Sequence, residues 1–371
     1  MKKNILITGG AGFIGSHLAD ELIAKGYKIR ALDNLSEQVH GLKTQRPDYL
    51  HPEVELILGD VRDKETVRKA LQGIDAVFHF AAMVGVGQSM YQIKNYTDVN
   101  NLGTAILLEA LIESPVEKLI VASSMSIYGE GLYKTTTGTS VEECKRKLED
   151  LKNQQWELQE DAQNYLMPIP TPEDKKPCLS SVYALSKYDQ ERLCLITGKA
   201  YGIPATALRF FNVYGTRQAL SNPYTGVLAI FASRLLNNNA PLIFEDGLQK
   251  RDFVHVKDVA RACRLALENS NADGEVINIG SGNQYTIREI AEKLAQVMNK
   301  EIEPQVTGKY RVGDIRHCFA DLTKARALLG FEPCVPFNEG LAELSVWLEG
   351  QIAIDHVHKA TNELALRGLT V

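Results

Sequence analysis

The sequence predicts an α/β protein built on a doubly wound parallel sheet, with a smaller C-terminal domain beside it. Two observations point to this fold class. Short apolar runs alternate along the first half of the chain with segments whose apolar residues recur at helical spacing. Several of these runs end in small or polar residues, which is how the strands of an open parallel sheet meet a ligand at their carboxyl ends.

The first apolar run, residues 5–7, leads directly into a glycine turn. Gly9, Gly12 and Gly15 follow it, and apolar residues then recur at helical spacing over residues 14–23. In this arrangement the three glycines permit a tight turn, close approach of a pyrophosphate, and close packing of helix on strand. Such a pattern alone also occurs in turns that bind nothing. The strand before it and the helix after it indicate a dinucleotide-binding site.

The second predicted strand, residues 27–32, ends in Asp33, about 20 residues after the turn. An acidic side chain at this position holds the hydroxyl groups of the adenosine ribose. It also repels a 2′-phosphate, so the sequence favours NAD over NADP as the cofactor.

Composition excludes several classes of protein. The chain has 371 residues, of which 44% are hydrophobic and 23% charged, and its net charge is −5 without a long basic block. We therefore expect an ordinary globular protein that does not bind nucleic acid. We also expect no membrane span and no signal peptide. The six cysteines are scattered and form no CxxC pair, which argues against a disulfide framework or a metal site. This use of cysteine fits a reducing cytoplasm, where we expect the protein to be located.

The first half of the chain alternates as a doubly wound fold requires. We predict strands at 55–58, 76–80 and 118–122, and helices at about 65–71 and 96–113. Small or polar residues follow the strands and mark the ligand-binding edge, namely Asp60, Val61, Ala81, Ala82, Ser123 and Ser124. His79 lies within an apolar strand, and we predict a packed core histidine there.

Residues 131–178 differ from their surroundings, because they are polar, heavily charged and then rich in proline. We interpret them as a surface insertion with one amphipathic helix and an extended return. We expect a solvated excursion without chemistry of its own.

The second half resumes the alternation. We predict strands at 205–210 and 275–279, and helices at about 181–201, 227–237, 256–269, 286–298 and 321–329, with helix from there to the end. We assign residues 1–210 to a dinucleotide-binding domain, to which segments near 252–280 return. Residues 211–371 are assigned mainly to a substrate-binding cap.

Tyr183 and Lys187 lie one helical turn apart, downstream of the strand that ends in Ser124. A free phenol has a pKa of about 10. A nearby ammonium group lowers this pKa, so that a phenolate can take the proton from a substrate hydroxyl while hydride leaves the same carbon. A serine hydroxyl can hold the reacting oxygen. A tyrosine–lysine pair alone is common on helix surfaces, but the dinucleotide turn and the strand-end serines make this combination typical of alcohol–ketone redox chemistry.

With these residues in place, the chain resembles the extended short-chain dehydrogenase/reductases, and within them the NAD-dependent sugar-nucleotide epimerase/dehydratase family. The matching motifs are TGGAGFIG at 8–15, GDVRD at 59–63, HFAA at 79–82, NNLGT at 100–104, SSMSIYG at 123–129, YALSK at 183–187, RFFNVYG at 209–215, RDFVHVKDVA at 251–260, NIGSG at 278–282 and RVGD at 311–314. They follow the family's order over nearly the whole chain. The resemblance implies a Rossmann-like sheet with a sugar-nucleotide-binding cap.

The resemblance also implies roles by position. Ser124, Tyr183 and Lys187 match the catalytic serine, base and lysine. The NAD site would comprise Gly9, Gly12, Phe13, Ile14, Gly15, Asp33, Asn34, Asp60, Val61, Ala81, Ala82 and Asn100, with Tyr183 and Lys187. The substrate site would comprise Val86, Ser124, Tyr183, Asn212, Val227, Arg251, Arg311 and Asp314. Two arginines suit a diphosphate, because each makes forked hydrogen bonds.

Departures from the family pattern narrow the expected reaction. Met125 and Ser126 stand where 4,6-dehydratases carry an acid–base pair, which argues against dehydration. Val84 stands where many UDP-galactose 4-epimerases carry lysine, and Thr216 where proline is usual. The long insertion and the run at 217–236 are most similar to the dTDP-L-rhamnose 4-epimerase subgroup. Its members often carry paired cysteines in the insertion, which are absent here, so no metal is carried over.

The resemblance therefore implies a nucleotide-sugar 4-epimerase that holds NAD through the whole cycle. Three alternatives stay open: a UDP-glucose/UDP-galactose type of specificity, a reductase that releases its cofactor, and a non-catalytic NAD sensor. The family further implies a homodimer formed through helices near 98–112 and 184–201.

Overall fold

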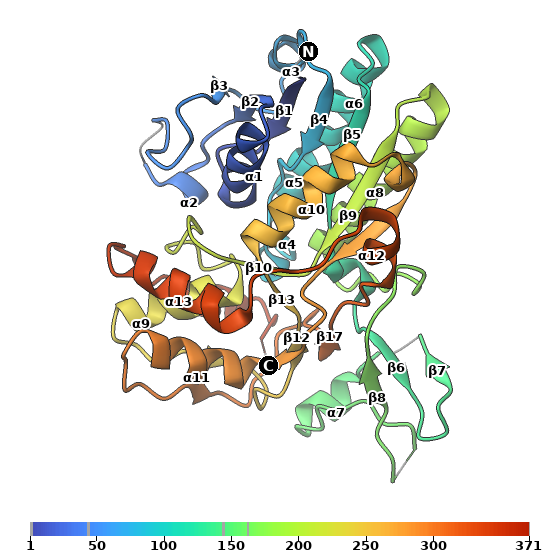
Figure 1. The fold of residues 1–371 in the computed structure, drawn as a ribbon. Helices are drawn as coiled ribbons and strands as arrows, with labels where there is room; N and C mark the ends of the chain where they lie inside the picture. The colour runs from blue at the N-terminus through green and yellow to red at the C-terminus, as the bar shows by residue number, and fades with distance from the viewer. Residues whose placement is uncertain (1–2, 43–44, 143–144, 162, 371) are drawn as a thin grey trace.

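A computed structural model describes residues 3–42, 45–142, 145–161 and 163–370. Its largest sheet has seven strands, all parallel, in the order β14-β9-β5-β4-β1-β2-β3 (Figure 1). The strands are β1 (Asn4–Thr8), β2 (Lys28–Asp33), β3 (Glu55–Leu58), β4 (Ala76–His79), β5 (Lys118–Ser124), β9 (Ala205–Phe210) and β14 (Val276–Ile279). The chain runs outward from β1 in one direction and then from β4 in the other, so the predicted doubly wound fold is confirmed.

Helices cover both faces of this sheet. One face carries α1 (Phe13–Ala24) and α10 (Val256–Glu268), and the other carries α3 (Lys64–Leu71), α6 (Gly103–Glu113) and α8 (Val182–Tyr201). The alternation of side chains along β1 explains the two layers: Ile5 and Ile7 pack into the first core and Leu6 into the second. The central strands β4, β5 and β9 are buried on both sides, as expected of a parallel sheet.

Short elements lie at the edges of this layered part. They are α2 (Glu37–His40), α4 (Val86–Ser89), α5 (Ile93–Tyr96), the π-helical η1 (Thr97–Leu102), the 3₁₀ turns η2 (Met125–Tyr128) and η3 (Ser270–Ala272), and α12 (Thr323–Leu329). The predicted helix at 96–113 is therefore interrupted, because residues 97–102 are wound as a π-helix and regular α-helix resumes only at Gly103.

A third apolar core is formed by α9 (Val227–Leu236), α11 (Ile287–Val297) and α13 (Phe337–Leu348), which lie together below the large sheet in Figure 1. Small sheets join this cap to the rest. They are β10 (Asn212–Tyr214) with β13 (Phe253–His255), β11 (Leu242–Ile243) with β16 (Gln305–Val306), and β15 (Tyr285–Thr286) with β12 (Lys250–Arg251) and β17 (His317–Cys318).

The insertion differs from the prediction. It contains a short helix, α7 (Leu148–Lys152), as expected, but also a three-stranded antiparallel sheet of β6 (Leu132–Lys134), β7 (Ser140–Val141) and β8 (Met167–Ile169) (Figure 1). It is not simply solvated, because Leu151 and Trp156 bury their side chains against Tyr310 of the cap. Tertiary packing, which local composition does not reveal, explains the error.

The prediction of continuous helix to the C-terminus was also wrong. Residues 330–336 and 349–356 are not helical, and the last helix is α14 (Val357–Leu366). In the second break, Asp355 accepts hydrogen bonds from Arg234 (3.0 Å) and Asn239 (2.8 Å) of the cap. These tertiary contacts hold the segment away from helical geometry.

Candidate active site

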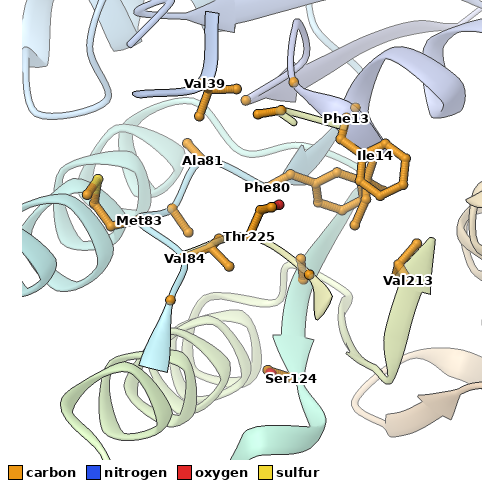
Figure 2. Close-up of a pocket in the computed structure, with 18 of the residues that line it drawn as sticks. Phe13, Ile14, Val39, Phe80, Ala81, Met83, Val84, Ser124, Val213 and Thr225 are labelled. Carbon is orange, nitrogen blue, oxygen red and sulfur yellow. The ribbon is translucent and has the colours of Figure 1, made fainter. Parts of the chain in front are cut away.

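A cavity of about 480 Å³ opens where the chain direction reverses, at the carboxyl ends of β1, β4 and β5. Figure 2 shows Phe13 and Ile14 at one end of it and Ser124 well away from them. The predicted site residues that line it are Gly9, Gly12, Phe13, Ile14, Gly15, Asp33, Asn34, Asp60, Val61, Ala81, Ala82, Val86, Ser124, Tyr183, Lys187, Asn212 and Val227. The fold thus gathers most of the predicted residues around one space.

The glycine turn has no room for side chains. Gly9 has a φ of +70°, and a Cβ there would lie 2.9 Å from the backbone nitrogen of Ala81. A Cβ on Gly15 would lie 2.4 Å from the carbonyl oxygen of Gly9. The side chain of Thr8 accepts hydrogen bonds from the backbone of Phe80 and Ala81, both at 3.2 Å, and so ties the two strand ends together. This cradle lets a pyrophosphate approach the backbone closely at the start of α1.

Carboxylates lie at one end of the cavity. Asp33 accepts hydrogen bonds from the backbone nitrogens of Ala11 (3.0 Å) and Leu35 (2.9 Å), which hold its carboxylate at the end of β2. Asp60 is bonded by Arg62, and this contact lowers the pKa of Asp60 to about 2. A carboxylate such as that of Asp33 at the cavity edge suits ribose hydroxyl groups and opposes a 2′-phosphate.

Ser124, Tyr183 and Lys187 meet at the other end. Ser124 is the last residue of β5, and its hydroxyl accepts a hydrogen bond from the Ser126 hydroxyl at 2.9 Å. Tyr183 lines the same cavity, and the nearby Ser124 hydroxyl favours its phenolate and so acts to lower its pKa. Lys187 lies one turn further along α8 and is 3% exposed. The three predicted catalytic residues therefore line the same cavity, and their catalytic roles stay a prediction. Ser126 is an addition for which the sequence offered no role.

Hydrogen bonds from neighbouring segments fix the start of α8, from which Tyr183 and Lys187 project. Ser181 accepts a hydrogen bond from the backbone of Ala184 at 3.1 Å. Ser89 of α4 accepts one from the backbone of Tyr183 at 3.0 Å. The amino end of the helix that carries the triad is therefore held by both its own cap and the loop beside it.

Asn100, a predicted NAD ligand, does not line the cavity. Its side chain donates to the Ser186 hydroxyl of α8 at 2.9 Å and accepts from the backbone of Met83 at 2.7 Å. Asn100 therefore joins the helix to the cavity wall, and its contact with NAD stays a prediction.

Gln190 is a residue that the sequence reasoning missed. Its side-chain oxygen accepts a hydrogen bond from the Lys187 ammonium at 2.6 Å, and its amide donates to Thr104 at 2.9 Å. The spacing of three residues on one helix was the available signal. His79 lies nearby, fully buried between the hydroxyls of Thr8 and Thr104, both at 2.8 Å, which confirms the predicted core histidine.

Burial governs the protonation of the triad. It lowers the pKa of Lys187 to about 8. Burial also raises the pKa of Tyr183 above its usual value, while the nearby Ser124 hydroxyl acts in the opposite direction. Burial thus disfavours the charged form of both side chains, the phenolate of Tyr183 and the ammonium of Lys187.

Arg251, Arg311 and Asp314 lie outside the cavity, in neighbouring segments of the cap. The guanidinium of Arg251 donates to the backbone oxygens of Lys250 and Arg316, both at 2.9 Å, and to that of Ile315. Arg311 pairs with Asp314 at 2.9 Å. None of the three lines the cavity with the triad, so their contact with a diphosphate stays a prediction.

Comparison with known proteins identifies the family. Residues 5–148 and 163–280 match the model of the NAD dependent epimerase/dehydratase family. The chain belongs to this family. It is 34% identical over 355 residues to the dTDP-L-rhamnose 4-epimerase of Burkholderia thailandensis, covering 94% of this chain and 96% of that protein. Several of its relatives are named as sugar-nucleotide 4-epimerases, and the chain is accordingly an enzyme of the nucleotide-sugar 4-epimerase family.

Solved structures agree with this placement. UDP-glucose 4-epimerase of Thermus thermophilus, crystallised with NAD, matches with a TM-score of 0.74 and 32% identity, over 94% of this chain and 100% of that one. UDP-glucuronic acid 4-epimerase of Bacillus cereus, crystallised with UDP-glucuronic acid and NAD, matches with a TM-score of 0.76 and 29% identity, over 93% and 99%.

The cofactor of this enzyme is NAD, and the residues present fit it. A glycine cradle, the carboxylate of Asp33 and the Tyr183–Lys187 pair line one continuous cavity.

Within the described ranges, no His, Cys, Asp or Glu side chains gather in threes as ligands of a metal ion; Cys144 lies outside those ranges. Nor does any helix in the same ranges have the length and apolarity needed to cross a bilayer.

Proposed function

We propose that this protein interconverts dTDP-L-rhamnose and dTDP-6-deoxy-L-talose, which differ at C4 of the sugar. The observation that carries the proposal is the Ser124–Tyr183–Lys187 cluster at one end of the NAD cavity, with no carboxylate at positions 125 and 126. This arrangement suits reversible oxidation of one hydroxyl and not elimination of water. The name of the Burkholderia thailandensis relative supports the choice of nucleotide sugar.

The chain's own residues would move one proton and hold one oxygen. Tyr183, as the phenolate, takes the proton of the C4 hydroxyl, and the charge of Lys187 stabilises that phenolate. Ser124, oriented by Ser126, holds the reacting oxygen. When bound, NAD supplies the acceptor for the C4 hydride and the donor that returns it to the opposite face of the same carbon. Tyr183 then gives its proton back to the sugar oxygen.

The substrate must turn in the site between the two transfers while its nucleotide stays held. We place the sugar beside Val86, Asn212 and Val227, which line the same cavity as the triad. The diphosphate would extend toward Arg251 and Arg311 of the cap. The side-chain oxygen of Asn212 is buried without a hydrogen-bond partner among the described residues, which leaves it free to accept one from a substrate.

Product analysis tests this proposal. Purified protein is incubated, without added cofactor, with dTDP-L-rhamnose and separately with UDP-glucose and UDP-glucuronic acid, and the sugar protons are followed by NMR. A new 4-epimer from the dTDP sugar alone supports the proposal. Conversion of a UDP sugar instead would replace the substrate assignment and keep the mechanism. If the protein binds NAD but forms no epimer from any of the three sugar nucleotides, the proposed function is contradicted.

A UDP-sugar 4-epimerase is the second candidate, favoured by the overall match to the Bacillus cereus enzyme.

We also propose a homodimer, formed through α6 and α8, which pack side by side. Leu185 and Ile196 lie about three turns apart on one side of α8, and are 51% and 59% exposed. Apolar side chains so exposed on one face suit a second copy of the chain. The cytoplasmic location stays a prediction.

A further inference from the structure

Three amide side chains meet beside the cavity, and each comes from a different segment. Gln38 belongs to α2, Gln88 to α4, and Asn222 to the loop that precedes α9 in the cap. Gln88 and Asn222 are 4% and 7% exposed. The proposed mechanism gives none of them a role.

Gln38 joins the other two. Its side-chain nitrogen donates to the oxygen of Gln88 at 3.1 Å and to that of Asn222 at 3.2 Å. The nitrogen of Gln88 donates back to the oxygen of Gln38 at 3.0 Å. The half-buried side chain of Gln38 thus takes part in three hydrogen bonds, which link the short helices α2 and α4 to the loop before α9 of the cap.

Neighbouring donors determine which way these amides face. The backbone N–H of Tyr224 can only donate, and it lies 3.0 Å from the side-chain oxygen of Asn222. The hydroxyl of Tyr96 donates to the oxygen of Gln88 at 3.1 Å. Both oxygens therefore face a second donor, and Gln38 must present its nitrogen to them.

The linked segments both contribute to the wall of the cavity. Next to Gln38, Ser36, Val39 and His40 line it, and Asn222 and Thr225 line it from the cap. Figure 2 shows Val39 and Thr225 among the residues around this space. The hydrogen bond from Gln38 to Asn222 therefore joins two parts of the cavity wall.

We propose that Gln38, Gln88 and Asn222 form a latch that closes over bound NAD and retains it from one turnover to the next. This inference rests on the proposed function, because an epimerase returns its hydride to the sugar and never needs to exchange the cofactor. Side-chain amides stay uncharged as protons move in the site, so the latch is unaffected by the chemistry. Because its bonds are few and neutral, it still opens for NAD to enter.

Two substitutions at Gln38 test the latch. Gln38→Ala removes all three bonds. Gln38→Glu keeps the shape, but its carboxylate faces the oxygens of Gln88 and Asn222 and cannot donate to them. Gln92→Ala is the matched control, because Gln92 lies on the neighbouring segment and its side chain bonds the exposed Asn95. Each protein is loaded with radiolabelled NAD, chased with unlabelled NAD, and assayed for retained label. Thermal unfolding of the NAD-free proteins checks that they fold alike.

Release from Gln38→Ala is expected to be about ten-fold faster than from the wild type, and release from Gln38→Glu at least as fast. The Gln92→Ala protein is expected to release NAD at the wild-type rate, with all unfolding temperatures alike. Wild-type release from both Gln38 variants would overturn the latch, as would equally fast release from the control. The assay needs no sugar. The two proposals can therefore fail separately. If the Gln38 variants release NAD fast but the wild-type protein epimerises no tested sugar, the latch is supported and the proposed function is refuted.

Discussion

Tyr183 is the residue on which the proposed chemistry depends most directly. Tyr183→Phe removes the hydroxyl that takes the proton and leaves the ring and its contact with Tyr96 in place. Turnover is expected to fall at least about 100-fold, because general acid–base catalysis contributes on this scale. The NAD content of the purified protein should not change. NMR of the sugar protons and absorbance of released NAD measure the two effects.

The control for this variant is Tyr201→Phe, the same substitution at the exposed end of the same helix, where turnover should stay at the wild-type level. Undiminished turnover in Tyr183→Phe would assign the base to another residue.

The lowered pKa of Lys187 predicts that the activity of the enzyme depends on pH. This pKa of about 8 lies below the usual value because burial disfavours the ammonium form. The phenolate of Tyr183 loses this positive charge once Lys187 deprotonates. Activity is therefore expected to decline as the pH rises through about 8.

Lys187→Arg keeps a charge at every accessible pH. The substitution should lower kcat, because the guanidinium is larger than the ammonium. It should also abolish the decline of activity between about pH 7 and pH 9.5. Initial rates across this range check both statements. The same decline in wild type and variant would mean that another group titrates.

At the scale of elements, the insertion is attached to the cap by buried charges. Arg316 is fully buried and pairs with Glu157 of the insertion and with Glu245 and Asp246 of the cap. Arg146 of the insertion adds ion pairs to Glu130 and Glu245. The insertion therefore supports the segment that carries Arg311 and Asp314, in addition to contacting solvent.

Removing one partner from a buried ion network leaves uncompensated charge. Arg316→Met is expected to lower the free energy of unfolding by about 3–5 kcal/mol. Arg68→Met provides the comparison, because Arg68 also pairs with two carboxylates, Glu65 and Glu113, but is 40% exposed. Its expected loss is much smaller, because exposed charges stay solvated and their attraction is screened. Denaturant unfolding measures the free energy of unfolding of both variants. Equal losses in the two would contradict a special role for the buried ion network of Arg316.

The C-terminal helix α14 (Val357–Leu366) and the residues after it contact two segments of the proposed substrate site. Leu364 packs on Gly87, where a Cβ would lie 3.3 Å from its methyl carbons. The guanidinium of Arg367 lies 4.4 Å from the ring centre of Tyr91. Leu369 accepts a hydrogen bond from the backbone of Val312 at 2.9 Å. The tail thus contacts both the loop after Val86 and the segment of Arg311.

Deleting the residues after Asp355 is expected to raise the KM for the nucleotide sugar about ten-fold, because the site loses preorganisation, while NAD content stays unchanged. Steady-state kinetics of the truncated protein check this. Ile352→Ser, at a position 95% exposed, should leave the KM as it is. An unchanged KM in the truncated protein would show that the tail does not shape the site.

At the scale of the whole molecule, the proposed dimer predicts sensitivity to charge on α8. Ile196→Lys places a charge in the proposed interface and is expected to shift the protein toward the monomer in sedimentation equilibrium. Val346→Lys, 70% exposed on α13, should leave the mass unchanged. A wild-type protein that is monomeric at micromolar concentration would contradict the dimer itself.

Local sequence sufficed where local physics decides the structure. The strand Ala205–Phe210 was predicted with its observed bounds, and helix α8 within a residue at its start. The glycine turn was recognisable because its conformation excludes side chains at Gly9 and Gly15. The short sheet in the insertion escaped prediction because β7 is only two residues long and is formed through its partner strand.

The sequence by itself determined the doubly wound fold, the NAD cavity and the meeting of Ser124, Tyr183 and Lys187, because strand ends of a parallel sheet converge at one edge. Only the tertiary structure decided that Gln38 meets Asn222, and that Arg251 binds backbone carbonyls beside the cavity. These contacts join segments far apart in the chain. Their geometry depends on how these distant segments pack together, and no local spacing encodes it.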